Sequence, residues 1–389
     1  MINVEKCIGC QACVDFCVKQ AILFRYNEWG EGRAVVDQSR CINCGLCDSL
    51  CPNINIKFNK AQTTVFAAVS NNNHHTGSSG GVFFELASCF INEGGVVFGA
   101  AFNDDLKLVH QKCTTISELA KICKSKYLHS DMTGIYNQIS ECLRLGKKVM
   151  FVGTPCQVSA VKNTFSMRFK DQLLLIDFLC HGTGTQKIFD LCIHNEEEKQ
   201  KGKITDFSFR AKTRKAEHSF QYTVTSETEK RIISGFSFEF PYYYSYLKYT
   251  IFSDSCYECK YPRSERVGDI TLGDFWGIQN YNKKLHDQNG VSMLSVNTKL
   301  GKQYFEKVRV KCVAYEYPIE NALEKNQAFR ERVCVCSYNK KKELASILNH
   351  QGEAALVERL SCPNIKKQIV YAKTPMFIKK VWNRVRGIR

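Results

Sequence analysis

The sequence lacks any apolar run long enough to cross a membrane, and it lacks an export signal. LLLIDFLC at 173–180 is among the longest apolar runs, and Asp177 interrupts it, whereas a spanning helix needs about 20 apolar residues. The first cysteine stands at position 7 with no apolar region before it, so we expect no signal peptide and a cytoplasmic protein. G-x-G-x-x-G and Walker patterns are also missing, which excludes the standard dinucleotide and nucleoside-triphosphate loops.

Low-complexity linkers are missing too, so the domains are expected to pack closely. The chain has 389 residues, 44% hydrophobic and 24% charged, which indicates an ordinary globular protein of two or three domains. Its formal net charge of +16 would favour nucleic acid as a partner. We discount that partner, because each cluster held by four thiolates contributes roughly two negative charges.

Cysteine, by contrast, is abundant. The chain has 21 cysteines, an odd number, and a reducing compartment argues against a disulfide framework. CIGCQACVDFC at 7–17 returns as CINCGLCDSLC at 41–51, with every cysteine shifted by 34 positions. Thiolate metal sites therefore explain the cysteines better than disulfides do.

The cysteine spacing is the signature of a bacterial ferredoxin with two 4Fe-4S clusters. In a C-x2-C-x2-C-x3-C run, three cysteines bind one cluster and the fourth binds the neighbouring cluster. The expected ligand sets are Cys7, Cys10, Cys13 and Cys51 for one cluster, and Cys41, Cys44, Cys47 and Cys17 for the other. Pro52 follows Cys51 as the signature requires, whereas Val18 follows Cys17.

Two other interpretations of these cysteines are weaker. Zinc sites usually use two cysteine pairs with a longer gap between them. Buried core cysteines would have no reason to recur at a fixed offset. Two such clusters move single electrons and do not by themselves bind a substrate.

The remaining pattern predicts a fold of the α+β to α/β class. Residues 1–60 form the two-cluster ferredoxin-like module, with a hairpin in AILFRYNEWGEGRAVVD. Residues 61–185 alternate strand and helix signals and predict an α/β domain. Residues 186–335 predict a mixed domain, with an antiparallel sheet from KITDFSFRAK, FQYTVTSE and RIISGFSF and a loop over DSCYECKYPRSERVGDITLGDFWG. Residues 336–389 are expected to form a basic helical tail.

Four further cysteines could form a third quartet. Cys156 and Cys180 each follow a predicted strand, and the carboxyl ends of parallel strands form the ligand crevice of an α/β sheet. Cys256 and Cys259 come from CYEC, with two residues between them. The alternative is that Cys156 and Cys180 are small buried apolar residues, which is common for cysteine.

Three loops are candidates for phosphate or ring binding. TGSSGG at 76–81 precedes a helix, and GTP at 153–155 follows a strand, so exposed amides at a helix start could hold a phosphate. KSKYLHSD offers Lys126 for a phosphate and Tyr127 for stacking on a ring. Taken alone, the first two are as well explained by tight turns with helix caps, and the third by a surface helix start.

The end of the chain is strongly basic. Residues 363–389 contain eight basic and no acidic residues, and Ile378, Val381, Trp382 and Val385 fall at helical spacing. Such a segment could dock on an acidic partner or associate peripherally with a membrane surface. An amphipathic helix lying on the body with its basic face solvated is the alternative.

Several segments, taken in order, resemble the beta-subunit family of the coenzyme F-420 hydrogenases and dehydrogenases. They run from residue 7 to about 298, and the ordered set is far more specific than any one of them. The segments are CIGCQAC, CINCGLC, SSGGV, GGVVFGAAF, SKYLHSD, GTPCQ, CHG, SCYEC, GDITLGDFWG and GVSMLSVNT. Before CYEC the relatives tend to have an arginine and a proline, and this chain has FSDSC, which puts any anion contact of that arginine in doubt.

The resemblance implies an iron–sulfur flavoprotein with FAD in the α/β domain. It assigns FAD contacts to three loops, and it favours the third cluster. The implied contacts are Ser79, Gly80, Gly81, Ser125, Lys126, Tyr127, Gly153 and Thr154, and the implied third ligand set is Cys156, Cys180, Cys256 and Cys259. The implied electron donor is a reduced carrier such as ferredoxin or a deazaflavin.

The leading hypothesis is an FAD- and 4Fe-4S-dependent oxidoreductase that passes electrons between clusters and a two-electron carrier or substrate. Asp269, Asp274 and His181 stand near the third set and could position substrate or protons, although no catalytic residue is assigned. The alternative is an electron-transfer subunit or partner-binding module whose substrate is handled by another polypeptide. A nucleophilic Cys156 activated by His181 is a weaker third hypothesis.

Overall fold

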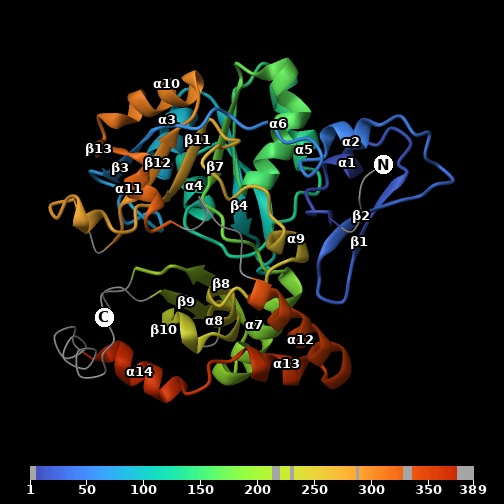
Figure 1. Cartoon of the computed structure of the whole chain (residues 1–389), viewed down its shortest axis with the longest axis vertical. Helices are drawn as coiled ribbons and strands as arrows, with labels where there is room; N and C mark the ends of the chain where they lie inside the picture. The colour runs from blue at the N-terminus through green and yellow to red at the C-terminus, as the bar shows by residue number, and fades with distance from the viewer. Residues whose placement is uncertain (1–5, 213–219, 228–231, 286–288, 327–334, 375–389) are drawn as a thin grey trace.

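The computed structural model describes residues 6–212, 220–227, 232–285, 289–326 and 335–374. Figure 1 shows three parts: a cysteine-rich N-terminal lobe on one side, a body built on a large sheet, and a second body with a small sheet and most of the C-terminal helices. The lobe lies against α5, α6 and α9 (Figure 1).

The N-terminal lobe is a hairpin flanked by two short helices. Its elements are α1 (Ala12–Asp15), β1 (Ile22–Tyr26), β2 (Gly32–Val36) and α2 (Leu46–Leu50). The strands β1 and β2 pair antiparallel, which confirms the expected hairpin. Cys13, Ile22 and Ala34 form a small buried cluster in the lobe, and Cys7, Val14, Cys17, Val36, Cys47 and Cys51 pack around them. Because thiols replace much of the usual apolar interior, little hydrophobic burial stabilises this lobe.

The large sheet has eight strands in the order β13-β3-β12-β11-β7-β6-β4-β5. Its strands are β3 (Thr64–Ser70), β4 (Val96–Phe102), β5 (Leu108–Cys113), β6 (Val149–Gly153), β7 (Leu173–Phe178), β11 (Ile270–Asp274), β12 (Ser292–Val296) and β13 (Cys312–Pro318). The central strands β4, β6, β7 and β11 are parallel, and the remaining pairs are antiparallel. The mixed sheet confirms the expected mixed α/β class.

Helices cover both faces of this sheet (Figure 1). They are α3 (Val82–Asn92), α4 (Ile116–Ile122), α5 (Ile135–Arg144), α6 (Pro155–Phe169), α10 (Lys299–Arg309) and α11 (Ile319–Leu323). Alternate residues of a strand point to opposite faces, so Met150 packs with α3, α4 and α10, whereas Phe151 packs with α5 and α6. Burial on both faces fixes the register, since a shift by one residue would exchange the two sets.

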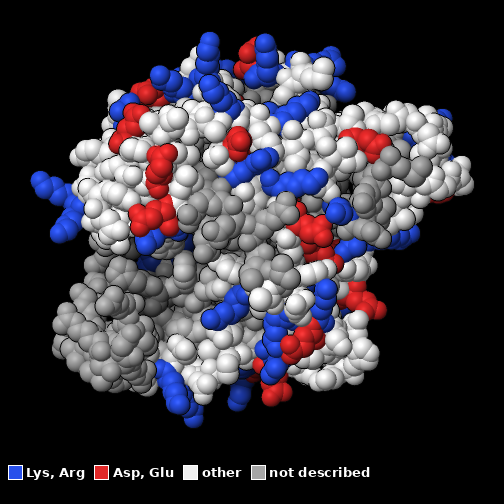
Figure 2. All heavy atoms as spheres, viewed as in Figure 1, with Lys and Arg blue, Asp and Glu red and all other residues white. Residues whose placement is uncertain are grey.

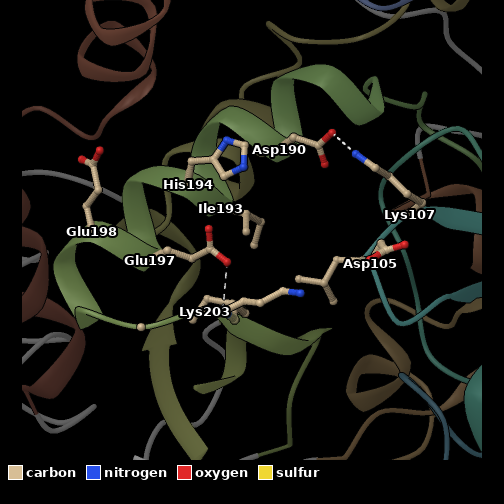
Figure 3. Close-up of a pocket in the computed structure, with 11 residues that line it drawn as sticks. Asp105, Lys107, Asp190, Ile193, His194, Glu197, Glu198 and Lys203 are labelled. Carbon is tan, nitrogen blue, oxygen red and sulfur yellow. Dashed lines mark hydrogen bonds and ion pairs between the residues drawn. The ribbon is translucent and has the colours of Figure 1, made fainter. Parts of the chain in front are cut away.

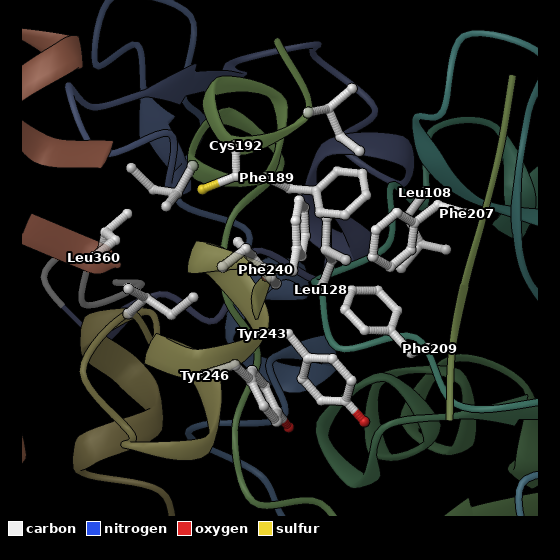
Figure 4. Packing of buried hydrophobic residues seen from close by; sticks show 14 of the residues in the cluster. Leu108, Leu128, Phe189, Cys192, Phe207, Phe209, Phe240, Tyr243, Tyr246 and Leu360 are labelled. Carbon is white, nitrogen blue, oxygen red and sulfur yellow. The ribbon is translucent and has the colours of Figure 1, made fainter. Parts of the chain in front are cut away.

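The second body combines a three-stranded sheet with helices. Its elements are α7 (Gln186–Gln200), β8 (Ile204–Phe209), β9 (Gln221–Ser226), β10 (Ile232–Phe236), η2 (Ser237–Glu239), α8 (Pro241–Leu247), α9 (Asp254–Tyr257), α12 (Val335–Gln351), α13 (Glu353–Leu360) and α14 (Ile365–Lys373). The short turn η3 (Ile278–Asn280) is not part of this body and lies in the loop before β12 of the large sheet. The order β10-β9-β8 is antiparallel throughout, as expected. Figure 4 shows the aromatic core of this body, where the Phe207 and Phe240 rings lie 4.8 Å apart.

The expectation of a loop over 254–277 was wrong in part. This stretch contains α9 and, in the middle of the large sheet, β11 between β7 and β12. Its glycines suggested breaks in regular structure. Gly268 instead allows the chain to pack closely on β7, because a Cβ there would lie 2.7 Å from the Asp177 nitrogen. A glycine that lets two backbones approach is compatible with a strand.

The large sheet takes strands from both sides of residue 185, so the boundary expected there crosses the sheet. The segment after 335 is helical as far as the structure describes it, through α12, α13 and α14. The apolar positions Ile378, Val381, Trp382 and Val385 lie outside the described residues. None of the helices in the described ranges combines the length and the apolar character that a membrane span requires.

Candidate functional site

The sequence repeat of the lobe is also a repeat of backbone conformation. Gly9 and Asn43, 34 positions apart, both have positive φ angles, of 71° and 54°. Gln11 and Gly45, again 34 apart, adopt the left-handed conformation at the starts of α1 and α2. Each cysteine run therefore wraps in the same way, and each presents its first three thiols from one loop and one helical turn.

Four thiols of the lobe surround a small cavity. Cys17, Cys41, Cys44 and Cys47 line this cavity of about 140 Å³, together with Cys13 of the other set. These four are the cysteines that the spacing assigns to one site, including Cys17 from the other half of the repeat. Cys44 is exposed, so this quartet, called the outer quartet below, reaches the surface of the lobe.

The other four thiols of the lobe form the inner quartet: Cys7, Cys10, Cys13 and Cys51. Cys10 and Cys13 are buried. Burial raises the pKa of Cys10, and the charges of Cys13, Cys7 and Cys51 raise it further. Burial, Cys7 and Cys51 likewise raise the pKa of Cys13 to about 12. The structure thus brings together the four cysteines of the second expected set.

The scattered cysteines of the body also meet in space, and we call them the body quartet. Because β6 and β7 are parallel, Cys156 in the first turn of α6 and Cys180 just beyond β7 emerge at one edge of the sheet. Burial raises the pKa of Cys180, and Cys256, Cys156 and Cys259 raise it further. Burial raises the pKa of Cys259, and the charges of Cys256 and Cys156 raise it further, to about 12. The four thiols are therefore close enough for the charge on one to raise the pKa of another.

The chemistry of these donor sets fits iron–sulfur clusters. Like charges packed at one buried site oppose ionisation, and a positively charged centre would convert the thiols to thiolate ligands. Within the described residues, no three His, Cys, Asp or Glu side chains are grouped so that they could hold a single metal ion. Around the outer quartet the thiols instead enclose a cavity, as a centre of several atoms requires.

Hydrogen bonds reach sulfur in the lobe and in the body quartet. In the lobe the Ala21 amide donates to Cys17 Sγ at 3.2 Å. In the body quartet hydroxyls also take part, with Thr154 Oγ1 at 3.1 Å from Cys156 Sγ and Thr183 Oγ1 at 3.8 Å from Cys256 Sγ. Hydrogen bonds to ligand sulfurs are one of the means by which proteins set cluster potentials.

Two of the expected flavin loops, those at 79–81 and 125–127, meet at the carboxyl edge of the sheet. The Ser125 amide donates to Ser78 Oγ at 2.6 Å, so the 124–127 segment is tied to the loop before α3. Gly80 packs so closely on β3 that a Cβ would lie 2.3 Å from the Ala68 carbonyl oxygen. The Ser79 hydroxyl is buried and finds no hydrogen-bond partner in the described part of the chain. A binding site for a polar ligand would contain such a buried hydroxyl, since the ligand would supply the hydrogen bond.

Lys126 and Tyr127 face different neighbours. Lys126 donates to the Cys123 carbonyl oxygen at 2.6 Å, and burial lowers its pKa to about 8. The Tyr127 ring stacks on Tyr246 with centroids 4.3 Å apart. Any ring that stacked on Tyr127 would therefore extend an existing aromatic stack.

The third expected flavin loop is engaged in a network of its own. Thr154 caps α6, bonds with Gln157 and contacts Cys156. Gln157 donates to Ser130 Oγ at 2.9 Å, and Ser130 bonds with His110 Nδ1 at 2.8 Å. The Thr154 side chain is thus directed to the body quartet and to the helix cap.

Tyrosines occupy the space between successive quartets. Tyr261 donates to the Pro52 carbonyl oxygen at 2.7 Å and lies near Cys10, Cys156 and Cys259, whose charges add to the effect of burial in raising its pKa. Tyr246 is also buried, and the nearby charges of Cys180, Tyr127 and Cys256 likewise add to the effect of burial in raising its pKa. The groups therefore lie next to one another in a series: the outer quartet, the inner quartet, the body quartet and then Tyr127.

The three polar residues noted near CYEC have different roles. Asp269 accepts from the Leu175 amide at 2.8 Å and from Thr298 at 2.6 Å, so it joins β7 to the start of α10. His181 stacks on Tyr249, and burial lowers its pKa. The hydrogen bond of Cys156 is to Thr154, so no geometry here supports activation by His181.

Asp274 has a partner that sequence reasoning missed. Arg210, at the end of β8, pairs with Asp274 at 2.8 Å and donates to the Ser78 carbonyl oxygen at 3.1 Å. Its guanidinium also lies over Phe220 and Trp276. A lone arginine directly after a strand was the only signal in the sequence, and it did not indicate the partner.

A buried charge network ties the lobe to the body beside CYEC. Lys341 of α12 bonds with Glu31 of the lobe and with Asp254 of α9, and Arg33 bridges the same two carboxylates at 2.9 Å each. Glu31 and Lys341 are both 5% exposed at the side chain. The C-terminal helices therefore help to fix the lobe against the body quartet.

Two larger hollows lie elsewhere. Figure 3 shows a cavity of about 650 Å³ between α7 and the β4–β5 turn, where Lys107 pairs with Asp190. A second, of about 410 Å³, lies between the lobe and the body and is lined by Cys7, Tyr26 and His129 among others. Neither contains the Ser79 loop or the body quartet.

Comparison with known proteins agrees with the order of these parts. Residues 6–54 match the 4Fe-4S dicluster domain. Residues 146–321 match the family described as the C terminus of the beta subunit of coenzyme F420 hydrogenase/dehydrogenase. This part of the chain is similar to that beta-subunit family. The match includes the body quartet, whereas the Ser79 and Lys126 loops lie before it.

Two known proteins are similar to parts of this chain to different degrees. An uncharacterized ferredoxin of Methanocaldococcus jannaschii is 38% identical over 52 residues, which is 13% of this chain and 66% of the ferredoxin, just under two thirds of its length. A chain of the F420-reducing [NiFe] hydrogenase complex from Methanosarcina barkeri is a distant likeness at 16% identity and a TM-score of 0.45, over 74% of this chain and 90% of that chain.

Proposed function

We propose that this protein is an FAD- and 4Fe-4S-dependent oxidoreductase that passes electrons between its clusters and a two-electron carrier or substrate. The observation that supports this most is the order of neighbours: outer, inner and body quartets, then Tyr246 and Tyr127 at the crevice. A flavin, when bound, exchanges single electrons with clusters and electron pairs with organic substrates. The proposed catalytic class therefore needs a flavin beside the body quartet.

The residues at the crevice suit the parts of FAD in different ways. The loop of Ser79, Gly80 and Gly81, with the α3 amides behind it, would hold phosphate, and Ser125 is bonded to that same loop. Lys126 would supply a positive charge, and Tyr127 a ring face. Gly153 would let the chain approach closely, while Thr154 serves chiefly the body quartet.

The experiment that tests this function follows the flavin. Protein purified without oxygen is reduced by dithionite, and the flavin absorbance is recorded before and after addition of oxidised ferredoxin, a deazaflavin or another acceptor. The proposal expects bound FAD that bleaches with the clusters and is reoxidised by a two-electron acceptor. If no FAD is released on denaturation, the flavin step is wrong and the chain is a relay for another polypeptide, the alternative function.

Flavin affinity should depend on pH through Lys126. Because its pKa is lowered to about 8, Lys126 is charged below that pH and increasingly neutral above it. Its attraction for the FAD phosphates is therefore present at neutral pH, and the dissociation constant should rise by up to about tenfold per pH unit above 8. Titration of flavin-stripped protein with FAD between pH 6.5 and 9.5 measures this.

Variants at neighbouring lysines separate that effect from general charge. Lys126→Met should bind FAD weakly at neutral pH and lose the pH dependence above 8. Lys121→Met, which changes an exposed lysine of α4, should retain the wild-type profile. A wild-type profile in Lys126→Met would remove Lys126 from the flavin site.

A further inference from the structure

The surface around the outer quartet is unusually apolar for an exposed part of the protein. Val18 is 73% exposed, Ile42 55% and Leu46 38%. All three line the same cavity as the outer-quartet thiols, so they form one patch, which we call the lobe patch. Exposed large hydrophobic side chains are ordinary when scattered, but a contiguous group beside a functional site marks a contact surface.

The exposed charges at the lobe patch have one sign. Among the exposed residues of segments 18–20 and 38–46, the charged ones are Lys19 and Arg40, both basic. Asp48 lines the same cavity, and Asp15 and Asp37 are near in sequence, but these three residues are less exposed than Lys19 and Arg40. In the view of Figure 2, the outer end of the lobe carries mainly uncharged side chains. An apolar centre with a basic rim is complementary to an acidic partner.

Access to the outer quartet comes from the same side. Cys44, between Ile42 and Leu46 in the chain, is itself exposed, whereas Cys10 and Cys13 of the inner quartet are buried. The inner quartet is covered by the body, since the Tyr136 hydroxyl donates to the Cys10 carbonyl oxygen. A partner that exchanges electrons with the lobe would therefore approach the outer quartet.

We propose that the lobe patch of Val18, Ile42 and Leu46, with Lys19 and Arg40 at its rim, is the docking surface for an acidic one-electron carrier protein of the ferredoxin type. This rests on the proposed function, because it assumes that the outer quartet holds a redox centre. One electron would pass per encounter, from the reduced carrier, which is oxidised, to this protein, which is reduced. The formal net charge of +16, which clusters with roughly two negative charges each would reduce but not cancel, would add long-range attraction for the carrier.

The test combines binding and electron transfer with an acidic two-cluster ferredoxin as the probe. Ile42→Asp and Val18→Asp should each raise the dissociation constant for oxidised ferredoxin, measured by calorimetry, by at least about tenfold. The rate of reduction by reduced ferredoxin should fall by a similar factor. Lys19→Glu, which leaves the apolar centre intact, should lower the rate mainly at low salt.

Matched controls decide the interpretation. Val310→Asp alters a residue that is 83% exposed at the end of α10, and α10 lies away from the lobe in Figure 1. It should leave both quantities within about twofold of wild type. Reduction by dithionite and the cluster absorbance should be the same in every variant. If dithionite reduces none of these proteins, the proposed function fails; if it reduces all of them, only the docking surface is in question.

Two results would overturn the docking surface. One is equal ferredoxin binding by wild type, Ile42→Asp and Val310→Asp. The other is a wild-type dimer that Ile42→Asp converts to monomers without a change in ferredoxin affinity, which would assign the lobe patch to a contact between two copies of this chain.

Discussion

Replacing Cys180 with serine should remove about four irons per chain and leave the lobe quartets loaded, by the four irons expected for each set of thiolates. The charges of all three other cysteines of the body quartet act on Cys180, so its loss would leave that set with three thiols. The lobe ligands come from a separate segment, so their absorbance and paramagnetic signal on reduction should persist. Iron and acid-labile sulfide per chain, measured on anaerobically purified protein, give the result.

A buried cysteine outside the quartets provides the control for that substitution. Cys192 is fully buried in the aromatic core of the second body, so Cys192→Ala removes a thiol that lies outside the quartets and should cost no iron. If Cys180→Ser retains the iron of wild type, or if Cys192→Ala loses as much, the body quartet is not a cluster site. The four thiols would then be neighbours in a core, as the alternative interpretation of Cys156 and Cys180 had it.

Replacing Arg266 with methionine should destabilise the fold by about 3–5 kcal/mol, because it would leave a buried carboxylate without its cation. Asp177 lies near the carboxyl end of β7 and is 0% exposed, and its Oδ1 is 3.3 Å from the Arg266 guanidinium. The amides of Val267 and Gly268 also donate to Asp177, at 3.2 and 3.0 Å. Those two bonds hold β11 beside β7, so the loss should loosen the middle of the sheet.

Urea unfolding followed by far-UV circular dichroism, without oxygen, measures this loss. The double variant Asp177→Asn with Arg266→Met should recover much of the stability, since it removes the uncompensated charge. Arg309→Met is the matched control, because Arg309 pairs with Glu306 at 3.3 Å on the surface, and it should change stability by less than about 1 kcal/mol. An Arg266→Met protein as stable as Arg309→Met would contradict the assigned role of this ion pair.

The cysteine spacing was the part of the site that the sequence determined best. Within a run of eleven residues, local geometry decides which thiols can share a centre, and the offset of 34 relates the runs to each other. The crossed sets follow from this, and the structure places Cys17 with Cys41, Cys44 and Cys47. The third quartet was harder to predict, because its members are spread over more than 100 positions and meet only through the parallel pairing of β6 and β7.

Long-range polar pairs could not be predicted at all. Nothing near Lys341 indicates that it bonds with Glu31, 310 positions away, or that Arg210 bonds with Asp274. Such pairs depend on how helices and strands pack, which residue types alone do not specify. The strand β11 was missed for a related reason: Gly268 looks like a chain break in isolation, and only the close approach of β7 explains it.

The most direct test of the central claim is the content of iron, acid-labile sulfide, zinc and flavin per chain in protein purified without oxygen. Three thiolate quartets and one flavin site predict about twelve irons, as much sulfide and one FAD, by four irons per quartet. Colourless protein that carries zinc and releases no FAD would contradict the account.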